Sequence, residues 1–199
     1  CWGFAGLNLF RVHLGRKYNL KDFQFSQSYF MFWDKLEKSN YFLESILQTL
    51  DKDWNSRILM HLLSDPIQDG GQWDMWVNLV EKYGVVPQSE MSESFSSSQS
   101  ARMNKMITRK LRENAKILRS KASKNSDATS LNKIKNGMLK DIYKMLTVHL
   151  GTPPKKFNWQ TRDKKNNFIR FKNETPQSFF KNHVGLKLDE YICLINCPM

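Results

Sequence analysis

Cys1 stands directly before a stretch with helical character, CWGFAGLNLFRVHL. The free N–H groups and the dipole at a helix N-terminus favour a thiolate over a thiol, and Trp2 could shield the sulfur from bulk water. A thiolate in that position could attack a carbonyl carbon and form an acyl-enzyme. The alternative is that Cys1 is a small buried hydrophobe. Its position by itself leaves both interpretations open.

A thiolate nucleophile needs a general base within hydrogen-bond reach, and the sequence offers four histidines. His13 follows on the same helix, about 18 Å along its axis from Cys1, so it cannot be that base. His61 reads as a packed or surface residue, whereas His149 and His183 fall at helix ends, where an interaction with the helix dipole explains them. None stands in a recognisable triad arrangement with an Asn or Asp. The sequence therefore shows the nucleophile half of a site without its base.

The other two cysteines, Cys193 and Cys197, fall in an apparent strand, where four residues span about 13 Å. A disulfide requires Cα atoms within about 7 Å, so this pair could form only if the chain turned back at Pro198. Without nearby histidines they make no zinc site, and we expect no metal or other cofactor. Free thiols are typical of a reducing compartment, so we expect a cytoplasmic protein. No apolar run approaches the roughly 20 residues of a membrane span, and the opening residues lack a signal-peptide pattern.

The net charge of +12 is concentrated in one segment. Residues 101–172 hold 20 Lys and Arg against 4 Asp and Glu, whereas residues 1–100 hold 9 against 12 and residues 173–199 hold 2 against 3. Basic residues recur there at helical spacing, at Arg102, Lys105, Arg109, Arg112, Lys116 and Arg119. This basic stripe could neutralise phosphates of a nucleic acid. The alternative, which we favour, is a solvated helix face or a subunit contact.

The first half of the chain reads as helices separated by polar loops. Ser26 is a good N-cap for the second helix, and Gly15 and Gly84 are plausible helix stops. Gly70 and Gly71 mark a loop. The helices are expected at 1 to 13 or 14, 27 to about 38, 40–50, 54–65 and 72–83.

The second half begins with a serine-rich connector over 88–100, which we expect to be a surface loop. A helix follows with an apolar stripe of Met103, Met106, Ile107, Leu111, Ala115 and Leu118. A further helix over 131–150 ends at Gly151. The alternating segment 156–172 predicts a hairpin, Thr175 and Pro176 open a short helix, and YICLI predicts a buried strand.

These segments also carry a family resemblance. CWGFAGLNLFR resembles the nucleophile segment of papain-like cysteine proteases. FQFSQSYFMFWDKLEKSNYFLES, DGGQWDMWVNLVEKYGVVP and FNWQTRDKKNNF with TPQSFFKNHV resemble the bleomycin hydrolase and aminopeptidase C branch. The motifs run in order from Cys1 to about Asn196. The implied fold is α+β, the mainly helical half of a papain-like cysteine protease with the family's helical insertion and a short β-hairpin. The implied domains are a helical subdomain over 1–95, a basic helical insertion over 96–152, and a hairpin, short helix and strand start over 153–199.

The resemblance implies a cysteine-type aminopeptidase that cleaves N-terminal aminoacyl amide bonds through an acyl-enzyme and assembles as a homohexamer. Cys1 matches the nucleophile. Gly70 and Gly71, after Asp69, match the glycine pair whose backbone lines the non-prime side of the substrate cleft, and the resemblance implies that Asp69, Gly70 and Gly71 bind substrate. Glycines suit that task because a substrate backbone can approach them closely. By themselves the two glycines would instead read as a tight turn before a helix.

Several parts of the family pattern have no counterpart in the 199 residues. These are the oxyanion-hole Gln upstream of the cysteine, the downstream His and Asn, and the C-terminal tail that enters the cleft. We therefore expect an internal fragment that is inactive alone. One alternative is a non-catalytic, helical nucleic-acid-binding module built on residues 101–150. Another is a relative that keeps the cysteine but has lost its base.

Overall fold

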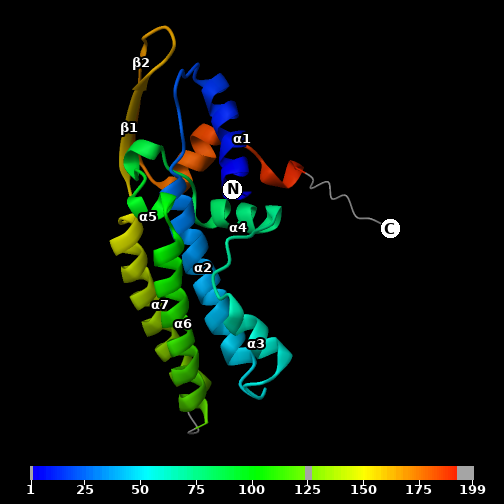
Figure 1. Ribbon diagram of the computed structural model, residues 1–199. Coiled ribbons are helices and arrows are strands. Elements are labelled where there is room, and N and C mark those ends of the chain that lie inside the picture. The colour runs from blue at the N-terminus through cyan, green and yellow to red at the C-terminus, as the bar shows by residue number, and fades with distance from the viewer. Residues whose placement is uncertain (1, 124–126, 192–199) are drawn as a thin grey trace. The chain divides into compact units, whose positions relative to one another are not determined.

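The computed structural model describes residues 2–123 and 127–191 (Figure 1). Within these residues the chain is mostly helical and carries one two-stranded antiparallel hairpin, which confirms the predicted α+β class. None of the helices described there is both long and apolar enough to cross a membrane. The chain forms two compact units, one from Cys1–Phe30, Gly70–Ser92 and Pro153–Met199, the other from Met31–Asp69 and Glu93–Thr152. The three-domain division expected from the sequence stays a prediction.

The first unit packs around an aromatic core. Phe10 is fully buried, and its ring lies 4.8 Å from that of Trp76 and 5.3 Å from that of Phe180. The elements that enclose it are α1 (Trp2–Lys17), the start of α2 (Gln27–Gln48), α4 (Trp73–Tyr83), η1 (Gln88–Glu90), β1 (Phe157–Arg162), β2 (Phe168–Glu174), α8 (Pro176–Phe179), the π turn η2 (Phe180–Val184) and η3 (Leu188–Glu190). Gly84 ends α4 with a φ of 72°, as the sequence predicted.

The predicted end of the first helix is wrong, because α1 runs through Gly15 and ends at Lys17. A residue with left-handed backbone conformation terminates it: Asn19 has a φ of 52°, and the amide of Leu20 donates to the carbonyl of Gly15 at 2.9 Å. Asparagine tolerates this conformation better than most residues, so it can end a helix as glycine does. A single glycine within a helix costs only about 1 kcal/mol, which the buried face of α1 can offset.

The two helices expected over 27–38 and 40–50 are one continuous helix, α2. Its predicted N-cap is confirmed, since the amide of Tyr29 donates to the Ser26 hydroxyl at 3.0 Å. Ser39 does not break the helix because its hydroxyl donates to the carbonyl of Lys35, one turn back, at 2.7 Å. A serine bonded in this way is satisfied inside a helix, so the polar pair at 39 and 40 is no boundary.

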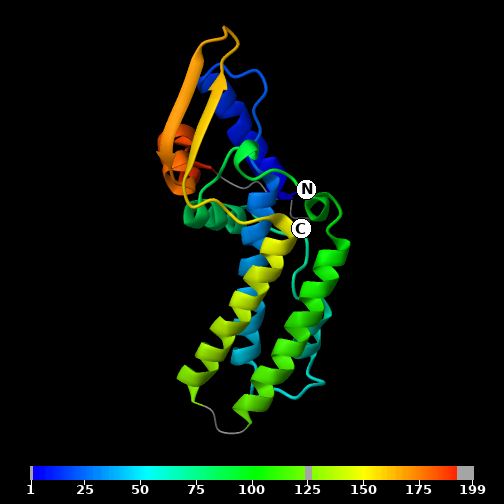
Figure 2. The ribbon, with the colours of Figure 1, turned by 90° about the vertical axis from the view of Figure 1, so that its left-hand side faces the viewer.

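The regular elements described in the second unit are all helices: the rest of α2, α3 (Arg57–Ser64), α5 (Phe95–Ser98), α6 (Ala101–Ala122) and α7 (Ala128–Leu150). Figure 2 shows α6 and α7 running side by side along their length. The predicted stripe of α6 is buried except for Met106, which is 46% exposed, while Asn114 is buried in addition. The plain loop expected over 88–100 is wrong, since the segment holds η1 and α5, and Ser94 and Ser97 form a reciprocal capping box at the N-terminus of α5.

The predicted hairpin is confirmed, with Trp159 of β1 opposite Phe171 of β2. The short helix after it is confirmed too. The Thr175 hydroxyl accepts from the amide of Ser178 at 3.0 Å, and Pro176 occupies the first helical position. The predicted strand YICLI lies outside the described residues except for Tyr191, and the predicted turn after α6 does so at residues 124–126.

Candidate active site

The N-terminal end of α1 is packed against two aromatic rings of its own unit. The Trp2 indole meets Phe30 edge-on, with ring centroids 5.4 Å apart. A Cβ on Gly3 would lie 2.3 Å from the Phe30 ring, and one on Gly6 would lie 2.2 Å from the Trp76 ring. These small residues let the helix approach both rings. Cys1, the predicted nucleophile, lies outside the described residues and precedes Trp2 in the chain.

Gly71 lies against Trp2. A Cβ on Gly71 would come within 2.5 Å of the indole, whereas one on Gly70 would meet no atom within 4 Å. Neither glycine has the positive φ that a glycine-requiring turn would show. At Gly71 the need for glycine is therefore steric, since any side chain there would collide with the first residue of α1.

Asp69, the third predicted substrate-binding residue, belongs to the second unit and forms an ion pair with Lys35 of α2. The Asn104 side-chain amide also donates to its carboxylate at 3.4 Å. The Lys35 side chain is only 1% exposed, while that of Asp69 is 66% exposed. The negative charge of Asp69 is thus already paired with a buried cation.

Two buried lysines of α2 bind the three residues before Gly70. Lys35 donates to the Ile67 carbonyl at 2.9 Å as well as to Asp69, and Lys38 donates to the Gln68 carbonyl at 2.7 Å. Lys38 also forms an ion pair with Asp34 at 2.9 Å. Burial raises the pKa of Asp34 and lowers the pKa of Lys38, and their mutual attraction opposes both shifts.

His183 is held in a hydrogen-bonded cluster that the sequence did not reveal. Its ring lies 3.0 Å from the Tyr18 hydroxyl and 3.0 Å from the Glu174 carboxylate, and it stacks on Phe171 at 3.7 Å. Tyr18 directly follows α1, so the cluster lies at the opposite end of that helix from Trp2, about 23 Å away along its axis. His183 does lie in the last turn of η2, as the sequence predicted, but its ring is held by specific side chains that the prediction did not include. We call Tyr18, His183 and Glu174 the histidine cluster.

The other histidines have separate surroundings. His149, in the last turn of α7, lies 3.0 Å from the Ser96 hydroxyl, and His61 is exposed on α3. His13 lies three turns along α1 from Trp2. Neither His13 nor His183, the two histidines of the unit that contains Trp2, is within reach of the start of α1.

The sequence as a whole now identifies the family, since residues 1–199 match the Peptidase C1-like family along their full length. The chain belongs to the Peptidase C1-like family. It is 48% identical over 198 residues to aminopeptidase C from Listeria innocua and 39% identical over 202 residues to bleomycin hydrolase from Gallus gallus. Both matches cover 100% of this chain and 44% of the relative, so the chain spans less than half the length of these curated relatives. The crystal structure of PepW from Lactobacillus rhamnosis superposes with a TM-score of 0.93 and 45% identity, over 96% of this chain and 43% of PepW.

In this Peptidase C1-like chain, the basic stripe of α6 is partly used for structure. Arg112 donates to the carbonyls of Leu63 and Ser64 at 2.8 Å each, and these residues end α3. Arg119 donates to the carbonyls of Thr49 and Lys52, just after α2, and lies over the Trp54 ring at 4.6 Å. These contacts favour a structural role for both arginines. Nucleic-acid binding by the remaining members of the stripe stays a prediction.

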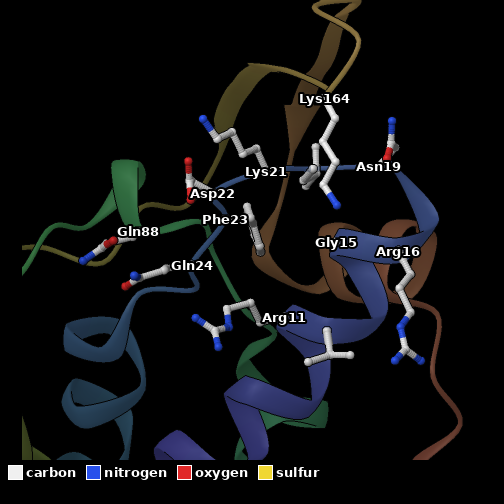
Figure 3. A pocket seen from close by; sticks show the side chains of 12 residues that line it. Arg11, Gly15, Arg16, Asn19, Lys21, Asp22, Phe23, Gln24, Gln88 and Lys164 are labelled. Carbon is white, nitrogen blue, oxygen red and sulfur yellow. The ribbon is translucent and has the colours of Figure 1, made fainter.

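A basic pocket of about 610 Å³ lies beside the C-terminal half of α1 and the segment that follows it (Figure 3). Two backbone hydrogen bonds of 2.9 Å hold the segments that line it: the amide of Lys164 donates to the Asn19 carbonyl, and the amide of Gln88 donates to the Gln24 carbonyl. Its charged side chains form no ion pair with any residue of 2–123 or 127–191: Arg11, Arg16, Lys21, Lys164 and Asp22. The surplus of positive charge favours anions there, far along α1 from Trp2.

Proposed function

We propose that the complete protein is a cysteine-type aminopeptidase of the aminopeptidase C and bleomycin hydrolase type. The observation that carries the proposal is the contact between Gly71 and Trp2. It brings the glycine loop before α4 beside the residue that follows Cys1, in a chain 48% identical to an aminopeptidase C. A nucleophile next to a loop with an accessible backbone is the arrangement that a thiol peptidase needs.

The proposed reaction is acyl transfer. The dipole of α1, a helix of 16 residues, favours the thiolate of Cys1, which attacks the carbonyl carbon of an N-terminal aminoacyl amide. Gly70 and Gly71 hold the substrate backbone on the non-prime side. A histidine protonates the leaving amine, and water then hydrolyses the thioester. His13 and His183 are far from the start of α1, and the chain spans only 44% of the aminopeptidase C that it matches, so we propose that this histidine comes from outside residues 1–199.

The test is hydrolysis of aminoacyl 4-nitroanilides by the complete protein. Cys1→Ser should lower kcat by at least about a thousandfold, because a serine hydroxyl, unlike a cysteine thiol, stays protonated near neutral pH and is a much weaker nucleophile in a site built for a thiolate. Cys193→Ser and Cys197→Ser are the matched controls and should keep the wild-type rate. Residues 1–199 alone should show no turnover, since they lack the proposed base.

Wild-type activity in Cys1→Ser would overturn the proposal. Turnover by residues 1–199 that Cys1→Ser abolishes would instead place the base within this chain and overturn the proposed origin of the histidine. Assembly as a homohexamer and a cytoplasmic location belong to the same proposal. They are supported by the resemblance to the aminopeptidase C branch.

A further inference from the structure

The segment that leads into the glycine pair is anchored residue by residue. The Ile67 carbonyl and the Asp69 carboxylate bind Lys35, and the Gln68 carbonyl binds Lys38. Lys35 and Lys38 lie three residues apart on α2 and therefore share one face of it. Both are almost fully buried, at 1% and 8% exposure. A buried ammonium group is costly, so its partners define what it stabilises, and here they include three consecutive residues of one loop.

We infer that Lys35 and Lys38 are positioning residues for the glycine pair, and that Asp69 is the anchor of the loop and not a contact of the substrate. This inference rests on the proposed function, because it requires that Gly70 and Gly71 bind substrate backbone. Glycines restrict their own backbone less than any other residue. The course of the chain through Gly70 and Gly71 therefore depends on what fixes it on either side. Trp2 limits Gly71, and the lysine anchors fix the residue before Gly70.

The charge balance separates an anchoring Asp69 from a substrate-binding one. An aminopeptidase substrate carries a positive α-ammonium group, for which a free carboxylate would be an obvious partner. The carboxylate of Asp69 already faces the Lys35 ammonium. A substrate ammonium would meet a neutralised pair there and gain little attraction from it.

Replacing Lys35 by Met in the complete enzyme gives opposite results for the two roles. Met keeps the length and the apolar stem of the side chain but removes its charge. If Asp69 anchors the loop, Lys35→Met frees the loop, and KM for aminoacyl 4-nitroanilides should rise at least tenfold while kcat changes less than threefold. If Asp69 binds the substrate ammonium directly, the same change unmasks its charge, and KM should fall or stay constant. That second result would overturn the inference.

Asp69→Ala supplies the other half of a double-mutant cycle. As two ends of one anchor, Asp69→Ala and Lys35→Met should each raise KM, and the double variant should be no worse than Lys35→Met. Lys35→Arg should restore part of the affinity because it keeps a cation. Multiplicative effects of the two changes would contradict a shared anchor.

Lys135 provides a matched control. It is 7% exposed on α7, and its ammonium group forms an ion pair with Glu44 and binds none of residues 67–69. Lys135→Met should leave KM unchanged. The thermal midpoint of Lys35→Met should stay within a few degrees of wild type, because the change removes the buried charge and the carboxylate it leaves behind, that of Asp69, is 66% exposed and can be hydrated by water. A rise in KM without loss of stability separates positioning from a general structural role.

Hydrogen exchange gives a readout that does not depend on activity. The amides of Gly70 and Gly71 should exchange at least tenfold faster in Lys35→Met than in wild type or Lys135→Met. If these amides exchange faster in Lys35→Met while the wild-type protein has no aminopeptidase activity, the anchor is supported and the proposed function is overturned. Unchanged exchange together with unchanged KM in an active enzyme would overturn the anchor alone.

Discussion

At the scale of single residues, the candidate site depends on glycines, whose lack of a side chain makes room for neighbouring aromatic rings. Gly71 leaves room for the Trp2 indole, and Gly3 leaves room for the Phe30 ring on the same helix end. The sequence pointed to Gly70 and Gly71 together through a family resemblance. It could not distinguish them, because the difference arises from a ring that belongs to a distant part of the chain.

Gly71→Ala should destabilise the protein by about 1–3 kcal/mol, because its methyl group would overlap the Trp2 ring. Gly70→Ala is the control: it has open space and no positive φ, so it should leave stability unchanged or raise it by up to about 1 kcal/mol. Urea unfolding followed by circular dichroism measures both variants. Equal stability of the two would mean that the indole moves away from Gly71 without cost.

At the scale of elements, two helix ends of the second unit are satisfied by arginines from α6. Arg112 reaches the last carbonyls of α3, and Arg119 reaches the carbonyls after α2. Helical spacing predicted the basic stripe, since the periodicity of charges is local. The spacing could not show that two of its members cap other helices, because that depends on how α6 packs against them.

Arg112→Gln and Arg119→Gln should each lower the free energy of unfolding by about 1.5–3 kcal/mol, the range for hydrogen bonds that involve a charged group. Arg102→Gln and Lys105→Gln remove the same charge from exposed positions of α6 and should stay within about 0.5 kcal/mol of wild type. Chemical denaturation of the four variants makes the comparison. Equal small losses in all four would show that the capping bonds contribute nothing net.

At the scale of the whole molecule, the sequence predicted most helices, the hairpin and the family. It placed their boundaries wrongly where a polar residue was satisfied inside a helix, as at Ser39, or ended one, as at Asn19. The two compact units could not be predicted from the order of segments in the sequence, because each unit is assembled from stretches that alternate along the chain. The histidine cluster was missed for the same reason, since His183 meets Tyr18 from the other end of the sequence.

The charge of the molecule and the histidine cluster together set its response to acid. Partial burial raises the pKa of Glu174, but hydrogen bonds from Ser178 and His183 outweigh it and hold the pKa below its usual value. The stability that Glu174 contributes is therefore complete above its unfolded pKa, about 4.3, and is lost as the pH falls through its folded pKa. Acid also adds positive charge to a protein that already carries +12.

Glu174→Gln should therefore lower stability at pH 7 and should narrow its difference from wild type as the pH falls from 5 to 3. Glu81→Gln, at an exposed position of α4, should run parallel to wild type over the same range. Thermal unfolding at a series of pH values provides the data. A constant gap between Glu174→Gln and wild type across that range would contradict the role given to ionised Glu174.

The contact between Trp2 and Gly71 also restricts how this sequence can evolve. A larger residue at position 71 collides with the indole, and a smaller residue at position 2 leaves a hole beside the glycine loop. The two positions can therefore change safely only together. Relatives that keep a tryptophan after the cysteine are expected to keep glycine at the position of Gly71, while the position of Gly70 is free of this particular constraint. Co-variation between these two positions would be the mark that the contact leaves in a family of sequences.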